Sequence, residues 1–484
     1  MQPVIQGIKN TFLLFSQEPI SSVEKLPQSG SDRTYFRIFT SGTTYIATHN
    51  LNRRETSTFV EFSRHFKQYG IPVPEIYAVN DDDTIYIQQD FGDISLLNKL
   101  EQWGHTPPVL RLFEQTLKEL AYMQITGGKT LNYDCCLTAK EFGKQAILSD
   151  LLYFKYYFLD TLKMPYDKQA LLDDFETLST YLTQTAHNHF MFRDFQSRNV
   201  MVNEDGVYFI DYQGGMRGAL QYDVASLLWQ AKADLPDHWK NSLLDYYMDC
   251  ADELLQTPLN REVFTGQYDG YVLIRLLQVL GAYGFRGLFE RKAHFLTSIP
   301  LALRNLRWFL AHKRIGLNLT EFDRLLQLIV EDTVIHRFEP IQATPESPLT
   351  VSINSFSFKQ KHPVDESENG GGFVFDCRGI YNPGRLEEFK RFTGRDKAVK
   401  DFLEQQTRMP DFLNNVYNLV DISVEDYLKR GFSKLMVSFG CTGGQHRSVY
   451  AADELARHLR NKFKVKTEVS HLVQDAKEWI NNLY

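Results

Sequence analysis

The sequence contains few cysteines and no arrangement of them that would bind a metal. Five cysteines occur among the 484 residues, and they include the adjacent pair Cys135 and Cys136. None has the C-x-x-C spacing or the histidine partners of a zinc site, and an odd number indicates no disulfide framework. We therefore expect buried thiols, with neither crosslinks nor a structural metal.

Long apolar segments are also missing. No apolar run approaches the roughly 18 residues needed to cross a membrane, and the segment from Met1 to Ile5 lacks the basic and apolar regions of a signal peptide. The Walker loop G-x-x-x-x-G-K-[ST] does not occur. With 43% hydrophobic and 23% charged residues, the composition is that of a soluble protein, which we expect in the cytoplasm without a membrane partner.

The net charge of -7 is divided unevenly along the chain. Acidic residues outnumber basic ones before residue 350, whereas basic residues are slightly in excess after it. An acidic surface disfavours general nucleic-acid binding by the first part, but the second part could tolerate a polyanion.

The order of the secondary-structure signals predicts two domains. Residues 20–100 alternate short strand-like runs with turns and one helical stretch, whereas residues 106–335 are mainly helical, with two short β runs near residues 190–212. Three prolines among polar residues, at 340–348, favour an extended connector. Strands and helices alternate after it, which is typical of an α/β domain with a largely parallel sheet.

We therefore predict an α+β bilobal domain in residues 1–340 and a separate α/β domain in residues 350–484. The first has a small lobe of about residues 1–95 and a helical large lobe of about residues 96–340. Residues 341–349 form the predicted proline-rich linker.

A catalytic-loop pattern lies inside the larger lobe. Residues 192–199 read Phe-Arg-Asp-Phe-Gln-Ser-Arg-Asn, and Ile-Asp-Tyr-Gln follows at 210–213 after a β run. Phosphoryl transfer needs a carboxylate that orients the attacking hydroxyl and oxygen ligands that hold Mg²⁺ against the nucleotide phosphates. Asp194 fits the catalytic role, and Asn199 and Asp211 fit the metal-binding role. The alternative is a hydrogen-bonded loop in which these side chains only cap turns.

This spacing resembles the catalytic loop of protein kinases, and residues 10–335 resemble the aminoglycoside phosphotransferase and choline kinase superfamily. The likeness is carried by residues 30–38, 192–199, 210–213 and 222–228. It is strongest with the cell-wall amino-sugar kinases, which phosphorylate N-acetylmuramate and N-acetylglucosamine at the anomeric hydroxyl. The resemblance implies a protein-kinase-like bilobal fold, ATP and Mg²⁺ as cofactors, and Asp223 as a brace for the catalytic loop.

The same resemblance implies the nucleotide-binding residues. A turn of small residues before a strand would offer backbone N–H groups to the phosphates. The segment at 88–92 would meet the adenine between the lobes, with a plain turn as the equal alternative. The predicted cofactor-binding residues are Ser29, Gly30, Ser31, Arg33, His49, Gln89 and Phe91.

One of these positions departs from the superfamily pattern. The strand lysine that pairs with the nucleotide phosphates aligns with His49, and a neutral histidine is a poorer phosphate partner than lysine. Arg33, Arg53 or Arg54 could substitute for the lysine. Glu55 is the candidate ion-pair partner of the substituting cation.

A second phosphate-handling pattern lies near the C-terminus. Residues 440–448 read Gly-Cys-Thr-Gly-Gly-Gln-His-Arg-Ser, between an apolar strand pattern and a helical one. Backbone N–H groups at the start of such a helix would bind an anion together with Arg447. Cys441 and Arg447 also match the phosphate loop of cysteine-dependent phosphatases, although the sequence identifies no general acid for that chemistry. A plain structural turn is the third interpretation.

Residues 349–484 resemble the C-terminal domain of the RapZ family. The likeness is carried by Ser355-Phe356, Phe375 to Arg378, Asn382-Pro383, Thr393-Gly394 and, above all, residues 440–448. That domain recognises glucosamine 6-phosphate, and in the best-known members it also contacts a small RNA. The resemblance implies a phosphosugar site made of Asp376, Arg378, Asn382, Thr442, Gly443, Gly444, His446, Arg447 and Ser448.

The RNA role is not carried over to this chain, because the Walker loop of the family's nucleotide-binding half does not occur here. The basic residues between 457 and 466 are interpreted as a solvated helix end, so RNA is a partner that the sequence permits but does not favour.

The expected function is that of an ATP-dependent kinase for an amino sugar of cell-wall metabolism, with a C-terminal sensor for a hexosamine phosphate. The alternatives are a catalytically weak regulator that binds both ligands, or a C-terminal phosphatase. Arg275, Arg286 and Asp245 are candidate acceptor contacts, although a surface role is the favoured interpretation of each. The sequence does not indicate an oligomeric state.

Overall fold

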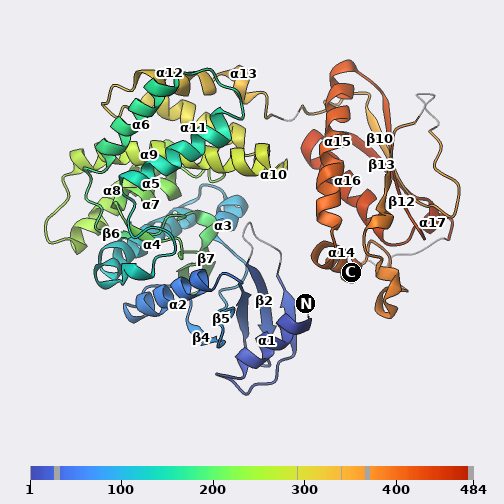
Figure 1. Ribbon diagram of the computed structural model, residues 1–484, viewed down its shortest axis with the longest axis horizontal. Helices are drawn as coiled ribbons and strands as arrows, with labels where there is room; N and C mark the ends of the chain where they lie inside the picture. The colour runs from blue at the N-terminus through green and yellow to red at the C-terminus, as the bar shows by residue number, and fades with distance from the viewer. Residues whose placement is uncertain (1, 27–32, 291–292, 340, 366–370, 478–484) are drawn as a thin grey trace. The chain divides into compact units, whose positions relative to one another are not determined.

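The computed structural model describes residues 2–26, 33–290, 293–339, 341–365 and 371–477 (Figure 1). The chain divides into two compact units. The first unit comprises Met1–Phe285 and Ser298–Ile335, and the second comprises Arg286–Thr297 and His336–Tyr484. The division thus lies slightly upstream of the predicted linker at residues 341–349.

The small lobe of the first unit is an antiparallel sheet with the strand order β1-β2-β3-β5-β4. Its strands are β1 (Ser22–Lys25), β2 (Thr34–Phe39), β3 (Thr44–His49), β4 (Ile76–Val79) and β5 (Ile85–Gln89). Helix α1 (Gln2–Phe12) packs Ile8 and Phe12 against Ala47, Ile85 and Ile87 on one face. Helix α2 (Arg53–Gln68) lies on the other face, where Phe59 contacts Tyr86. The two faces of β3 and β5 therefore have different surroundings, because successive side chains point to opposite faces.

The large lobe is mainly helical. Its helices are α3 (Leu96–Trp103), α4 (Pro107–Ile125), α5 (Lys144–Phe154), α6 (Lys168–Leu182), α7 (Leu220–Leu228), α8 (Asp237–Leu254), α9 (Arg261–Tyr283), α11 (Ile299–His312), α12 (Thr320–Ile329) and α13 (Asp332–Ile335). Two short antiparallel ladders interrupt the helices, β6 (His189–Met191) with β9 (Met216–Gly218), and β7 (Val200–Asn203) with β8 (Gly206–Phe209). The catalytic-loop sequence lies between β6 and β7.

Helix α9 continues into a π-helical segment, Gly284–Phe289. Together, as Arg261–Phe289, they are long and apolar enough to cross a membrane by length and composition. Helix α9 nevertheless belongs to the core of the large lobe, where Tyr271 and Leu276 are buried. It also buries two charged side chains, Asp269 and Arg275. Because these charges have partners inside the lobe, we interpret α9 as a core helix.

The second unit contains a fully parallel sheet with the strand order β11-β12-β10-β13. Its strands are β10 (Thr350–Ser357), β11 (Phe373–Asp376), β12 (Lys434–Cys441) and β13 (Lys466–His471), and its helices are α10 (Ala293–Leu296), α14 (Lys397–Gln406), α15 (Met409–Arg430), α16 (Arg447–Phe463) and α17 (Leu472–Asp475). This confirms the predicted α/β class with a parallel sheet. Because parallel strands run the same way, their carboxyl ends meet at one edge, where Ser357 lies opposite Cys441 and Asp376 opposite Gly440.

A partly buried polar cluster fastens this edge to α16. The Asp453 carboxylate accepts hydrogen bonds from Arg395 Nε at 2.8 Å and from His471 Nε2 at 3.2 Å. The other ring nitrogen of His471 is hydrogen-bonded to Ser355 Oγ at 2.8 Å. Burial alone would raise the pKa of Asp453, but His471 and Arg395 outweigh it and lower the pKa to about 2.

We expect this carboxylate to make the second unit acid-sensitive. A folded-state pKa below the unfolded value stabilises the fold above the unfolded pKa, and that stability is lost as the pH falls from about 5 toward 2. The shift corresponds to roughly 2 kcal/mol at neutral pH. Asp453→Asn should therefore lower the melting temperature at pH 7 by about 4 °C or more in calorimetry of the full chain. The deficit should shrink as the pH falls.

The control is Asp411→Asn, which removes a carboxylate that is 67% exposed and paired with Arg408. An exposed pair contributes roughly 0–1 kcal/mol, so this variant should melt close to the wild type. A deficit for Asp453→Asn that stays constant between pH 7 and pH 3 would contradict the assignment.

Candidate functional site

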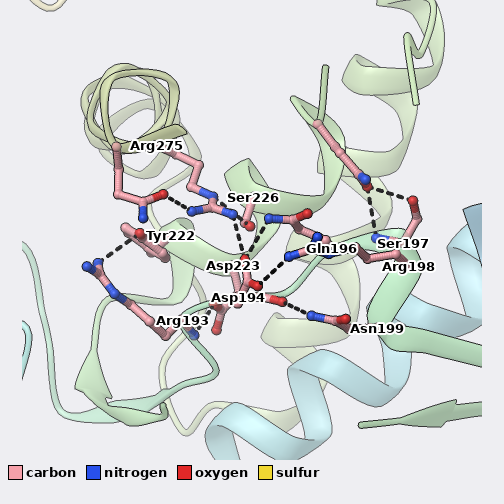
Figure 2. A network of polar contacts seen from close by, with 12 residues as sticks. Arg193, Asp194, Gln196, Ser197, Arg198, Asn199, Tyr222, Asp223, Ser226 and Arg275 are labelled. Atoms are coloured by element: carbon pink, nitrogen blue, oxygen red, sulfur yellow. Dashed lines mark hydrogen bonds and ion pairs between the residues drawn. The ribbon is translucent and has the colours of Figure 1, made fainter. Parts of the chain in front are cut away.

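The catalytic loop is anchored by a buried carboxylate on α7. Asp223 is 0% exposed and accepts hydrogen bonds from the backbone N–H groups of Phe192 at 2.7 Å and Arg193 at 3.0 Å, and from Gln124 Nε2 at 2.9 Å. Burial raises the pKa of Asp223 to about 7, although these three donors oppose the rise. The contacts confirm the predicted role of Asp223 as a brace for the loop (Figure 2).

Arg193 is held on its other side as well. Its guanidinium donates to both oxygens of Asp150, at 2.8 and 2.6 Å, and to the hydroxyl of Tyr222 at 2.8 Å. These contacts hold the Arg193 backbone at a φ of 82°, a left-handed conformation that side chains other than glycine rarely adopt. Phe192 stands where the superfamily usually has histidine, and it packs against Phe195 and Tyr212.

Asp194 lies at the centre of the polar network in Figure 2. Its Oδ1 accepts hydrogen bonds from Gln196 Nε2 at 2.6 Å and Arg275 Nη2 at 2.8 Å, and its Oδ2 accepts from Arg198 Nη2 at 3.1 Å. Burial alone would raise the pKa of Asp194, but Arg275 and Arg198 outweigh it and hold the pKa below its usual value. The carboxylate, 34% exposed, is therefore ionised at neutral pH.

The two predicted metal ligands follow Asp194 along the chain and are joined through the backbone. Asn199 donates its amide hydrogen to the backbone oxygen of Asp194 at 2.9 Å, so its side-chain oxygen is the atom that can face a cation. Asp211, with a φ of 71°, follows the β7–β8 ladder, and Asn199 and Ile210 are joined by a backbone hydrogen bond of 3.1 Å. One carboxylate and one amide oxygen form a donor set that suits Mg²⁺ shared with nucleotide phosphates.

Arg33 is the cation next to Asp211. Its guanidinium pairs with Asp211 Oδ1, and its Nε lies 3.5 Å from Glu55 Oε1. Gln213 Nε2 joins the same two carboxylates, at 3.0 Å from Asp211 Oδ1 and 3.4 Å from Glu55 Oε1. The structure therefore selects Arg33 among the three arginines and pairs it with Glu55. Arg54 instead donates to the backbone oxygen of Cys136 at 3.1 Å.

The structure places His49 on the other face of the sheet from its predicted nucleotide-binding position. His49 pairs with Ile85 across the sheet, and Ile85 and Ala47 belong to the face that α1 covers. Side chains two apart on a strand share a face, so His49 points away from the face that carries Tyr86. Burial lowers the pKa of His49, so its ring is neutral at pH 7. The strand position that faces the same side as Tyr86 is Thr48, one residue before His49. The predicted equivalence of His49 with the strand lysine of the superfamily is therefore shifted by one residue.

The remaining nucleotide predictions have mixed outcomes. Ser29, Gly30 and Ser31 lie outside the described residues. Gln89 and Phe91 lie where the chain passes from β5 to α3, as predicted; the Gln89 N–H donates to Glu75 at 2.9 Å, and the Phe91 ring stacks on Tyr208 with centroids 4.1 Å apart. Phe91 therefore serves mainly as packing, and the role of Gln89 toward a purine stays a prediction.

Sequence reasoning did not identify the part that Arg275 plays. The residue is 5% exposed and bonded to Asp194, so the favoured surface role is wrong. The signal was a single charged residue within the apolar run Tyr271 to Leu280 of α9. A lone cation in a buried helical stretch needs a partner, and here the partner is the candidate catalytic carboxylate.

The second site forms at the carboxyl edge of the parallel sheet. The loop between β12 and α16 turns at Gly444, whose φ of 66° requires glycine, and a Cβ there would lie 2.4 Å from Val473. Arg447, 3% exposed, donates to the backbone oxygens of Ile380 at 2.8 Å and Arg378 at 3.2 Å. Its Nε is buried without a partner among the described residues. Arg447 thus joins the phosphate loop to the segment that follows β11.

Several predicted phosphosugar residues brace the loop in this structure. His446 is hydrogen-bonded to the backbone oxygen of Phe389 at 3.0 Å, and Ser448 is 0% exposed and lies 3.2 Å from the Cys441 sulfur. In this structure the Ser448 hydroxyl is enclosed beside Cys441, and its role toward a phosphosugar stays a prediction. Asn382 caps its own turn through the Gly384 N–H at 3.2 Å.

The exposed groups at this edge are fewer. Thr442 and Gly443 form the exposed tip of the loop, and the Asp376–Arg378 ion pair at 2.7 Å lies next to it. Arg378, together with Arg447, lowers the pKa of Asp376, so this carboxyl is ionised and unsuited to act as a general acid. The structure thus brings together the loop tip, Arg447 and the Asp376–Arg378 pair at this edge of the sheet.

Cys441 is buried, 2% exposed, and its sulfur accepts a hydrogen bond from the Gly444 N–H at 3.2 Å. Burial alone would raise the pKa of its thiol, but Ser448, Arg447 and Gly444 outweigh it and lower the pKa. Within the described ranges, no group of three or more His, Cys, Asp and Glu side chains could hold a metal ion. The Cys441 sulfur therefore stabilises the loop through its contacts with Gly444 and Ser448.

Comparison with known families covers both units. Residues 22–254 match the model of the phosphotransferase enzyme family, and residues 349–475 match the model of the RapZ C-terminal domain. Both resemblances predicted from the motifs are thus confirmed.

Curated relatives share part of the chain. A nucleotide-binding protein of Fervidobacterium nodosum is 32% identical over 189 residues, which are 37% of this chain and 65% of the relative. A nucleotide-binding protein of Clostridium acetobutylicum is 42% identical over 116 residues, 24% of this chain and 38% of the relative. The chain thus spans between 38% and 65% of the length of these two relatives.

Solved structures that superpose on part of this chain include a choline kinase from Cryptosporidium parvum. It has 12% identity and a TM-score of 0.46, over 68% of this chain and 100% of that chain. The choline kinase LicA from Streptococcus pneumoniae has 14% identity and a TM-score of 0.42, over 64% of this chain and 99% of that chain. Aminoglycoside phosphotransferase APH(4)-Ia has 16% identity and the same score of 0.42, over 62% and 99%.

We expect Arg33 and His49 to differ sharply in nucleotide binding. Arg33→Ala should weaken the binding of Mg-ATP by about 10- to 100-fold, because it removes a charge-assisted contact worth roughly 1.5–3 kcal/mol. His49→Ala, on the opposite face of the sheet, should leave affinity within about 2-fold of the wild type. Equilibrium titration with a fluorescent ATP analogue measures both. The reverse ranking would restore His49 as the nucleotide cation.

Proposed function

We propose that this chain, which joins a domain of the phosphotransferase enzyme family to a RapZ C-terminal domain, transfers the γ-phosphoryl group of ATP to an N-acetylated amino sugar. The acceptor would be of the N-acetylmuramate or N-acetylglucosamine type, phosphorylated at the anomeric hydroxyl. The observation that carries the proposal is the grouping of Asp194, Asn199 and Asp211 on one braced loop system, with Arg33 beside it.

Each of these groups has a distinct role in the proposed reaction. Asp194 would orient the acceptor hydroxyl and take its proton as the new O–P bond forms. Arg33 would exchange its present carboxylate partners for the nucleotide phosphates. Asn199 and Asp211 would hold Mg²⁺, which when bound neutralises charge on those phosphates. The proposed location is the cytoplasm, where ATP and Mg²⁺ are available.

The charge around Asp194 supports a neutral or anionic acceptor. Two guanidinium groups, Arg198 and Arg275, contact the carboxylate and offset its negative charge. A cationic acceptor such as choline or an aminoglycoside would be repelled at this point. An N-acetyl group removes the charge of a sugar amine, and N-acetylmuramate adds a carboxylate. Both amino sugars therefore suit the site.

We propose that the second unit binds a hexosamine phosphate such as glucosamine 6-phosphate and serves as a sensor for the kinase. The support is the buried Arg447 Nε without a partner among the described residues, at the start of α16 next to the glycine turn. Helix N-termini and a buried guanidinium favour a phosphate. Any effect on the kinase would be a coupling between the two ligands, reciprocal in affinity.

A product analysis tests the kinase. Incubation with Mg-ATP and either N-acetylated sugar should give a sugar phosphate whose ³¹P signal couples to the anomeric proton, with an equal amount of ADP. Asp194→Asn should reduce turnover by at least about 100-fold, since a positioned base contributes roughly 10²–10⁴ in rate. Choline and an aminoglycoside are the control acceptors and should give no product. Absence of ADP with the wild type would favour the alternative, a regulator that only binds its ligands.

Calorimetric titration of the full chain with glucosamine 6-phosphate tests the sensor. Arg447→Ala should weaken binding by about 10- to 100-fold, as expected for losing a charged hydrogen bond. The matched control is Arg457→Gln on the same helix, a residue that is 66% exposed and should not alter binding. Release of inorganic phosphate from the ligand would contradict the sensor role and support the phosphatase alternative.

A further inference from the structure

Arg275 is a buried arginine whose guanidinium is fixed from two helices. It lies in the middle of α9, 5% exposed. Its Nε donates to Ser226 Oγ on α7 at 2.9 Å, and its Nη1 donates to Gln278 Oε1, one turn along α9. These two contacts set the plane of the guanidinium. The third nitrogen, Nη2, then lies 2.8 Å from Asp194 Oδ1 (Figure 2).

The two oxygens of Asp194 have different surroundings. Oδ1 accepts from the buried Arg275 and from Gln196, so both of its lone pairs are used. Oδ2 accepts from Arg198 at 3.1 Å, and the Arg198 side chain is 55% exposed. An exposed surface pair is weak and readily exchanged for another partner. Oδ2 is therefore the oxygen that an incoming hydroxyl can reach.

Rotation of the Asp194 carboxylate would break its hydrogen bond with Arg275. Because Arg275 belongs to the core of the large lobe, the core fixes the orientation of this carboxylate. The guanidinium has a planar, rigid set of donors, and its position is determined by α7 and α9. Asp194 thus has its backbone fixed through Asp223 and its carboxylate fixed through Arg275.

We propose that Arg275 is the positioning residue of the transfer reaction: it fixes Oδ1 of Asp194 and thereby aims Oδ2 at the acceptor hydroxyl. This inference rests on the proposed kinase function. In the reaction the hydroxyl proton passes to Oδ2, the hydroxyl oxygen bonds to the γ-phosphorus, and the bond from that phosphorus to the bridging oxygen breaks. ADP leaves with the electron pair. Arg275 itself contacts neither substrate.

The role predicts a specific kinetic pattern. Arg275→Gln should lower kcat by about 100-fold, because a misplacement of roughly 1 Å costs that much in rate. The KM for ATP and for the sugar should stay within about 3-fold, because Arg275 touches neither. Ser226→Ala, which removes one anchor of the guanidinium, should show the same split with a smaller loss. Arg275→Lys should recover part of the rate, since an ammonium can reach Oδ1 but not all three partners.

Arg261→Gln is the matched control. It removes another arginine of α9, 44% exposed and paired with Asp249, and should change kcat by less than about 3-fold. A loss for Arg261→Gln equal to that of Arg275→Gln would contradict the proposal, because the loss of any positive charge from α9 would then explain both. A wild-type kcat in Arg275→Gln would also overturn it.

A crystal structure of Arg275→Gln supplies a readout independent of turnover. The proposal requires the Asp194 carboxylate to rotate from its wild-type orientation while the backbone of residues 192–199 stays in place. An unmoved carboxylate would overturn the proposal even if activity were lost. If the wild type shows no turnover on any acceptor, the proposed function fails, whereas the structural comparison still decides whether Arg275 orients Asp194. If Arg275→Gln does not fold, crystal structures of Arg275→Lys and Ser226→Ala provide the same comparison.

Discussion

The catalytic loop depends on the burial of one carboxylate, Asp223, behind the backbone of residues 192 and 193. Burying a carboxylate is costly unless donors surround it, and here two backbone N–H groups and Gln124 supply them. Gln124 is in turn held by the hydroxyl of Tyr247 at 2.6 Å. The loop is thereby tied to α4, α7 and α8 at once, and the left-handed backbone of Arg193 is maintained. These contacts fix the backbone just before Asp194 and thereby its position.

The same lobe arrangement explains how the site manages without a lysine on β3. The inner face of the sheet at that point carries Thr48 and Tyr86, which leave no cation there. Arg33, just before β2, reaches the space instead and meets both Glu55 of α2 and Asp211. A guanidinium has several donors in a fixed plane, so it can join two carboxylates at once, which the point charge of an ammonium does less well.

The sequence was informative where chemistry requires residues at short, fixed spacing. The catalytic loop system carries Asp194, Asn199 and Asp211 at such spacing, and the glycine loop at 440–448 joins a strand to a helix. Both loops, and the fold classes of the two units, could therefore be predicted from the sequence. Strand β13 carries little sequence signal, because Lys466 to His471 contains one apolar residue, Val469, and so lacks the apolar alternation of a strand. His49 was misplaced because an alignment shift of one residue turns a side chain to the other face. Arg275 could not be placed, because its link to Asp194 spans 81 residues and depends on how α9 packs.

The loop of the second unit shows how an apparent nucleophile can be structural. Cys441 has a lowered pKa because the Gly444 N–H and Ser448 surround its sulfur. Those contacts also enclose the sulfur, so the groups that would stabilise a thiolate block its approach to phosphorus. Asp376, ionised beside Arg378, offers no proton to a leaving group. Arg447 donates through Nη1 to two backbone oxygens of the segment after β11, so it links the loop to that segment. Under the proposed sensor role, an anion bound at the loop would act on that segment through Arg447.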